Sequence, residues 1–199
     1  TAGTVTATPN VISQANVAYQ ILFTPGTAGK LVGGTSAGSD SITIKFTSGA
    51  TVVPASISAA NVSVNGTACT GIRVVTSGAG GTVKVVVPSG VTLPASTQAT
   101  VTFNSSAGLT NGGTAGNFQV QVSTDAENVL STQANNLTIA ATASLTITQV
   151  TNSPNNINGS AAYTIKFTTG SSGALAIGDT IFITFPTNTS VPSSIASSL

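Results

Sequence analysis

The run SITIKF at residues 41–46 decides the fold class of this chain. Ile42, Ile44 and Phe46 alternate in it with polar residues that begin with Ser41. Alternation with a period of two indicates a strand with one buried face and one face in water, as in antiparallel sheets. The apolar residues are therefore expected in a core, and Ser41, like Lys45, on the wet face.

The same alternation recurs along the chain in short runs bounded by Gly, Pro, Asn and Ser. The strands predicted from it are 3–8, 16–23, 41–47, 60–65, 71–76, 82–87, 98–104, 117–124, 135–140, 143–150, 161–168 and 179–185. No long stretch shows helical spacing. Many short strands separated by Gly- and Pro-rich turns predict an all-β fold, an Ig-like, Greek-key antiparallel β-sandwich.

An internal repeat divides the chain. The run AYQILFT at 18–24 matches AYTIKFT at 162–168, and DSITIKF at 40–46 matches DTIFITF at 179–185. Further on, VVPASI in the first copy is matched by SVPSSI in the second. The offset between the copies changes in the loop between the first two matches, where insertions are best tolerated.

The repeat predicts one complete β-sandwich module at residues 1–141 and the first three strands of a second, homologous module at residues 142–199. Three strands without a covering layer are marginal. We therefore expect the second module to be completed by a neighbouring chain or by sequence beyond residue 199. Because the chain does not begin with Met, it is expected to be processed or to be a piece of a longer protein.

The composition argues against several classes of partner. The chain is 40% hydrophobic but only 5% charged, with five Lys and Arg against four Asp and Glu. Its basic residues are not clustered, so nucleic-acid binding is not expected. No apolar run is long enough for a membrane-spanning helix, so no membrane insertion is expected. The single cysteine, Cys69, is interpreted as a small buried residue, with an intermolecular bridge or a reactive thiol as the alternatives.

The residues needed for catalysis are scarce. The chain has no His, so Ser–His chemistry and ordinary zinc sites are absent, and its four acidic residues are scattered. We therefore expect no enzymatic activity and no cofactor. Asp125 and Glu127 form the one close acidic pair, in the run STDAEN. They are the candidate for a Ca²⁺ site completed by backbone carbonyls, against a solvated turn as the alternative.

Two segments are candidates for an interface. Phe182 interrupts the alternation of its strand, because it lies on the face opposite Ile181 and Ile183. We expect it to cover a contact between modules or subunits. The N-terminal segment 1–8, with Thr4, Val5 and Thr6 at its centre, is a candidate for donation to a neighbouring chain.

Four runs carry a resemblance to a known type of protein: NVSVNGTACTGI, VVVPSGV, VTFNSSAGLTNGGTAGNFQVQVST and GDTIFITFPTNTSVPSSI. They resemble a β-rich repeat of large exported surface proteins of Gram-positive, often thermophilic, Firmicutes. Those proteins often contain many tandem copies, sometimes with S-layer homology domains. The resemblance implies an extracellular, cell-surface location and a structural role.

The function expected from these features is a self-associating extracellular protein that forms a fibre, sheath or surface layer. Its partners would be copies of itself, held by strand pairing and apolar packing. Attachment to the cell wall or to glycans is left open, and several Asn-x-Ser/Thr sequons occur. The alternative is a stalk or binding module of a cell-surface adhesin that recognises carbohydrate or a host surface. An exposed aromatic cluster or a filled metal site in the loop at 24–39 would favour that alternative.

Overall fold

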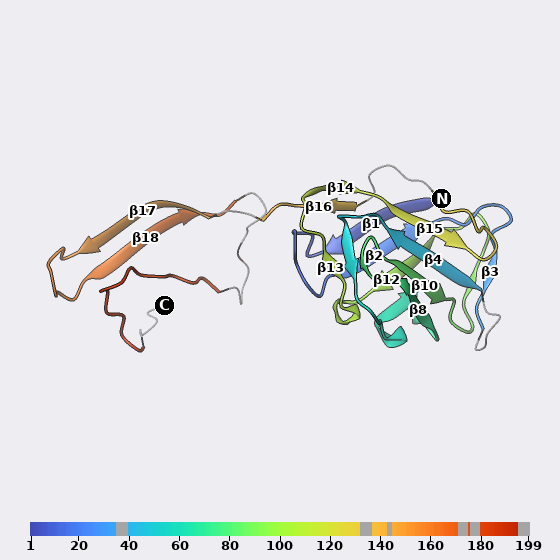
Figure 1. The fold of residues 1–199 in the computed structure, drawn as a ribbon, viewed down its shortest axis with the longest axis horizontal. Helices are drawn as coiled ribbons and strands as arrows, with labels where there is room; N and C mark the ends of the chain where they lie inside the picture. Colours follow the sequence, from blue (N-terminus) through green and yellow to red (C-terminus); the bar gives the residue numbers. More distant parts are fainter. Residues whose placement is uncertain (35–39, 132–136, 143–144, 171–174, 176–179, 195–199) are drawn as a thin grey trace. The chain divides into compact units, whose positions relative to one another are not determined.

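The computed structural model in Figure 1 describes residues 1–34, 40–131, 137–142, 145–170, 175 and 180–194. The chain divides into two compact units, Thr1–Thr142 and Ala143–Leu199. This division lies one residue from the boundary expected from the repeat. We call the two parts unit 1 and unit 2.

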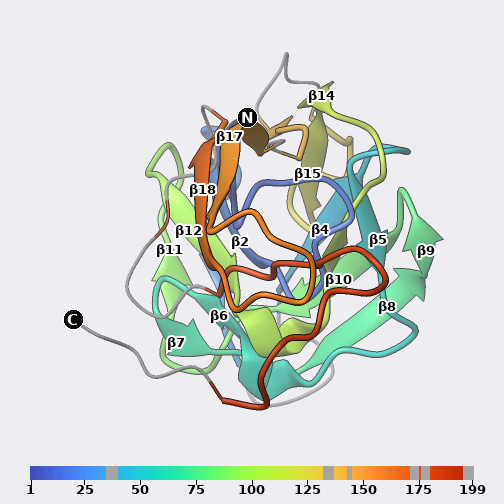
Figure 2. The ribbon, with the colours of Figure 1, turned by 90° about the vertical axis from the view of Figure 1, so that its left-hand side faces the viewer.

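Unit 1 is built on two antiparallel sheets. The first has the strand order β1-β2-β12-β6-β7, and the second has the order β15-β4-β10-β8. The strands of the first sheet are β1 (Ala2–Thr8), β2 (Ala18–Phe23), β12 (Ala99–Phe103), β6 (Val62–Val64) and β7 (Thr67–Ala68). Those of the second are β15 (Val120–Thr124), β4 (Ser41–Phe46), β10 (Thr82–Val86) and β8 (Ile72–Thr76). Figure 2 shows the first sheet on the left and the second on the right.

Smaller antiparallel sheets complete unit 1. They pair β3 (Leu31–Val32) with β11 (Thr92–Leu93), β5 (Thr51–Val53) with β9 (Gly78–Ala79) and β13 (Thr110–Asn111), and β14 (Gly116–Phe118) with β16 (Leu137–Ile139). Two 3-10 turns lie at Ala59–Asn61 and Ser105–Ala107. The strand predicted at 117–124 is thus two strands, because β14 pairs with β16 while β15 pairs with β4.

The inner faces of the two sheets meet in an aromatic cluster. Tyr19 of β2 and Phe46 of β4 lie edge to face with ring centroids 5.5 Å apart, and Phe103 of β12 lies 6.4 Å from Phe46. All three side chains are fully buried. Burying each large apolar side chain contributes about 1.5–3 kcal/mol, and the edge-to-face arrangement is favourable for aromatic rings. The cluster therefore joins the two sheets near the ends of β4 and β12 and the start of β2.

The chain crosses repeatedly between the sheets. Strands β2 and β4 belong to different sheets, and so do β12 and β15. Connections of this kind are typical of Greek-key sandwiches. The predicted all-β, antiparallel sandwich is confirmed.

The alternation predicted for β4 is observed with one exception. Ile42, Ile44 and Phe46 are fully buried and Lys45 is exposed. Ser41, expected on the wet face, is instead buried. The reason is tertiary, because the Ser41 hydroxyl donates a hydrogen bond to the carboxylate of Asp125, which follows β15.

Buried polar groups around Tyr19 form a closed network. The Tyr19 hydroxyl donates to the Asn111 side-chain oxygen and accepts from the Thr51 hydroxyl at 2.9 Å. The Asn111 amide donates in turn to the carbonyls of Pro9 and Val11, at 2.9 and 2.7 Å. Burial raises the pKa of Tyr19 to about 12, although the Thr51 hydrogen bond lowers it. The phenol is therefore neutral at physiological pH and fixes three strands and the loop after β1.

We expect Tyr19→Phe to destabilise unit 1 by about 1–3 kcal/mol, because it leaves the buried Asn111 oxygen without its donor. The free energy of unfolding in urea, followed by far-UV circular dichroism, measures this loss. The matched control is Tyr163→Phe at the corresponding position of unit 2, where the side chain is exposed. It should change the free energy by less than about 0.5 kcal/mol. Equal effects of the two substitutions would contradict the role given to the network.

Unit 2 contains one hairpin among its described residues. It is formed by β17 (Thr146–Ser153) and β18 (Ala162–Thr168), which pair antiparallel. The third strand predicted for this unit, 179–185, is wrong over the described residues 180–185, which form no strand. In unit 1 the matching strand, β4, is paired on both sides by β10 and β15. Among the described residues of unit 2, no strand pairs with 180–185, and the sheet there consists of β17 and β18.

No helix in the described part of the chain has the length and apolar character needed to cross a membrane.

Candidate functional site

The first predicted site residue, Asp125, holds the end of β4. Its carboxylate accepts hydrogen bonds from the Ser41 backbone N–H at 2.7 Å and from the Ser41 hydroxyl at 2.6 Å. It also forms an ion pair with Lys84 of β10 at 3.1 Å. Burial alone would raise the pKa of Asp125. The interactions with Ser41 and Lys84 lower the pKa by more than burial raises it, so the net shift is downward from 3.8. Asp125 thus ties β15 to β4 and β10 as a carboxylate.

We expect the contribution of Asp125 to stability to depend on pH. Because its pKa is lower in the folded chain than in the unfolded one, the contribution is present above pH 3.8 and disappears as the pH falls through the folded value. Asp125→Asn should therefore lower the free energy of unfolding at neutral pH, and the difference from wild type should shrink as the pH falls below 3.8. Urea unfolding across this pH range measures both.

The control for this experiment is Lys84→Gln, which removes the exposed ion pair but keeps the bonds from Ser41. It should cost less than about 1 kcal/mol and less than Asp125→Asn. A gap between wild type and Asp125→Asn that stays constant with pH would contradict the assignment.

Glu127 lies on the other side of this turn and faces different donors. Both carboxylate oxygens lie 2.9 Å from the backbone nitrogen of Gly26, and the Glu127 N–H donates to the Thr124 hydroxyl at 3.0 Å. Asp125 and Glu127 therefore each bind backbone N–H groups, of Ser41 and Gly26. Among the described residues, no group of three or more Cys, Asp or Glu side chains could hold a metal ion.

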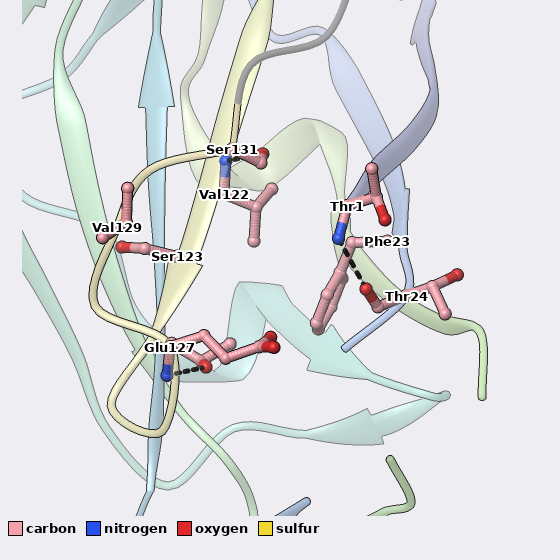
Figure 3. A pocket seen from close by; sticks show the side chains of 9 residues that line it. Thr1, Phe23, Thr24, Val122, Ser123, Glu127, Val129 and Ser131 are labelled. Carbon is pink, nitrogen blue, oxygen red and sulfur yellow. Dashed lines mark hydrogen bonds between the residues drawn. The ribbon is translucent and has the colours of Figure 1, made fainter. Parts of the chain in front are cut away.

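A small pocket of about 260 Å³ lies beside Glu127. Figure 3 shows Glu127, Val129 and Ser131 on one side of it, with Phe23 and Thr24 on the other. Two of its hydroxyl groups accept backbone hydrogen bonds within the protein, Ser131 from the Val122 N–H at 3.1 Å and Thr124 from the Glu127 N–H at 3.0 Å.

The calcium site at Asp125 and Glu127 stays a prediction, which a binding experiment can decide. We expect millimolar Ca²⁺ to leave the melting temperature of the chain unchanged, because both carboxylates already accept backbone N–H groups. Glu127→Gln and Asp125→Asn serve as controls. A rise in melting temperature in wild type that disappears in both variants would show that the carboxylates bind the ion.

The hairpin of unit 2 has the same register as the first hairpin of unit 1. In unit 1 Val5 lies opposite Ile21 and Ala2 opposite Phe23, with a bulge between these two pairs. In unit 2 the corresponding pairs are Val150 with Ile165 and Ile147 with Phe167, and the irregularity again falls between them.

The aromatic contact is also the same in the two units. Tyr163 of β18 and Phe185 lie edge to face, with centroids 5.2 Å apart and an interplanar angle of 74°. Their sequence counterparts Tyr19 and Phe46 lie 5.5 Å apart at 72°. Phe185 therefore contacts Tyr163 of β18 as Phe46 contacts Tyr19 of β2, although residues 180–185 form no ladder.

Burial is where the two units differ. Tyr19 and Ile42 are 0% exposed, whereas their counterparts Tyr163 and Ile181 are 44% and 47% exposed. Other large apolar residues of unit 2 are also exposed, namely Leu145, Ile147, Val150, Ile157, Leu175, Phe182, Ile183 and Val191. Large exposed apolar side chains that gather on one face are typical of an interaction site. We call the side of unit 2 that carries Tyr163, Phe185 and Ile181 its open face.

A groove of about 370 Å³ lies on unit 2. It is lined by Leu145, Phe167, Thr169, Gly170, Leu175, Thr180, Ile181 and Phe182. Phe182, predicted to cover an interface, lines this groove and is 90% exposed. Its ring is thus available for a contact, and its role there stays a prediction.

The N-terminal interface candidates lie in β1, which pairs with β2 of the same unit. Val5 is buried in the core, while Thr4 and Thr6 point outward and are exposed. Donation of this segment to another chain would remove Val5 from its own core. The outward-facing Thr4 and Thr6 stay candidates for a contact that leaves β1 in place.

Cys69 directly follows β7 and is buried. Burial raises the pKa of its thiol to about 12, so the thiol is protonated at neutral pH and poorly reactive. The interpretation as a small buried residue is confirmed.

Sequence reasoning missed the network of Tyr19, Thr51 and Asn111. The available signal was Tyr19 itself, because a Tyr on the inner face of a strand needs a partner for its hydroxyl. The partners come from residues far away in sequence, and no local pattern identifies them.

Comparisons of the chain with protein-family models, with curated proteins and with solved structures found no match.

Proposed function

We propose that this chain is a structural protein that associates with copies of itself to build an extracellular fibre, sheath or surface layer. The observation that carries the proposal is the open face of unit 2. Residues such as Ile181 and Tyr163 correspond to core residues of unit 1, but nearly half of each side chain is exposed. Covering such a face by another chain is the simplest way to remove it from water.

The distribution of charge supports the same function. Lys166 and Asp179 are the only charged residues between residues 143 and 199. Few charges then have to be desolvated or paired when chains pack together. Exposed strand edges are usually protected by charged side chains, especially Lys, and unit 2 has little protection of this kind.

The extracellular setting comes from the resemblance of four sequence runs to exported surface repeats. The adhesin alternative would be favoured by exposed aromatic rings in the loop at 24–39, but that stretch contains no aromatic residue. Self-association is therefore the function that the described residues support best.

We expect the purified chain to self-associate through unit 2. Its mass in sedimentation experiments should rise above 19.4 kDa with concentration, and negative-stain images should show ordered assemblies. Replacing Ile147, Ile181 and Ile183 by Thr should keep the chain monomeric, because it removes apolar area from the exposed surface of unit 2.

The matched control replaces three exposed Val residues of unit 1, Val32, Val52 and Val75, by Thr. This variant should assemble like wild type. A wild-type chain that stays monomeric at all concentrations would overturn the proposal, and so would equal assembly of the two triple variants.

A further inference from the structure

The strand β18 has one unused edge among the described residues. In unit 1, β2 lies between β1 and β12, whereas the sheet of unit 2 contains β17 and β18 alone. Since β17 and β18 pair in the register of β1 and β2, the second edge of β18 corresponds to the place that β12 occupies in unit 1. Among the described residues of unit 2, no strand occupies that place.

The register of β12 on β2 defines what this place accepts. Ala99 lies opposite Phe23, Val101 opposite Ile21, and Phe103 opposite Tyr19. Phe103 also contacts Phe46 edge to face and completes the aromatic cluster. A strand at the edge of β18 should therefore have a β-branched residue opposite Ile165 and an aromatic ring opposite Tyr163.

The sequence of β18 itself meets these requirements. Its run YTIKF at 163–167 parallels ATVTF at 99–103 of β12, with Thr, a β-branched residue and Phe at the same positions. Placed antiparallel in that register, β18 of a second copy puts its Ile165 opposite Ile165. Phe167 of the second copy then lies opposite Tyr163 of the first copy. Phe167 of the first copy likewise lies opposite Tyr163 of the second. The arrangement is consistent with itself under a two-fold axis, as a closed homodimer requires.

We propose that two copies of this chain pair through their β18 strands, antiparallel and about a two-fold axis at Ile165, into one four-stranded sheet. This inference rests on the proposed self-association and identifies its first contact. Phe167 of each copy takes the place of Phe103 and adds a third ring beside Tyr163 and Phe185 of the other copy. The larger Tyr163, which stands where β12 has Ala99, meets Phe167 beside the apolar groove of unit 2.

On the outward face of the new sheet, no like charges lie directly opposite each other. Thr164 and Lys166 are exposed on β18, and the register places Lys166 of one copy opposite Thr164 of the other. Like charges directly opposite each other would destabilise such a pair of strands, and this register avoids them.

Disulfide trapping in the chain of residues 1–199 tests the register. Thr164→Cys and Lys166→Cys variants are prepared separately and then mixed under mild oxidation. Residues directly opposite each other in an antiparallel pair lie about 4.5–5.5 Å apart at Cα, within the range of about 4.4–6.8 Å for disulfides. A cross-linked dimer is therefore expected in the mixture. Each variant alone should stay monomeric on a denaturing gel, because the like cysteines are diagonal at about 7–8 Å.

The matched control uses Gln20→Cys and Leu22→Cys, the counterparts of positions 164 and 166 on β2. Both edges of β2 are occupied in unit 1, so this mixture should not cross-link. All variants retain the buried Cys69, so the control also measures any cross-linking through Cys69.

The outcomes separate the two proposals. A dimer that is specific to the mixture of the position-164 and position-166 variants supports the β18 pairing. Self-association in sedimentation without this cross-linking pattern overturns the pairing and leaves the proposed function standing. A chain that is monomeric at every concentration overturns both.

Discussion

A hairpin with one apolar face is stable in water only when a second layer covers that face. In unit 1 this layer is the sheet around β4, and the contact between Tyr19, Phe46 and Phe103 joins the two sheets. The inward alternation of the other strands contributes to the same interior. Unit 2 has the same hairpin and the same first aromatic pair, but the residues described there include no second sheet.

A comparison of the two units therefore shows which features of the structure depend on local sequence and which depend on distant segments. Strand pairing, register and the bulge of the hairpin are alike in both, so they follow from sequence within the hairpin itself. The state of residues 180–185 differs from that of β4, because a strand needs hydrogen-bonding neighbours and β4 obtains them from β10 and β15. A sequence with clear strand alternation is thus not a strand until its partners are present.

The few charged residues of unit 1 serve the same architecture. Asp125 binds both the backbone and the hydroxyl of Ser41, and Glu127 binds the Gly26 N–H. Both carboxylates satisfy donors at the ends of strands or in loops, where no ladder is available. In a chain with 5% charged residues, most of the remaining surface is uncharged.

The sequence by itself determined the fold class, the positions of most strands and the correspondence between the two parts of the chain. These features depend on alternation with a period of two and on turn residues, which are local. Only the tertiary structure decided that Ser41 is buried, that 117–124 is divided between two sheets, and that Tyr19 binds Thr51 and Asn111. It alone decided that 180–185 stays outside a ladder and that Tyr163 is exposed where Tyr19 is buried. The physical reason is that each of these depends on which distant segment lies alongside, and short sequence patterns carry no record of that neighbour.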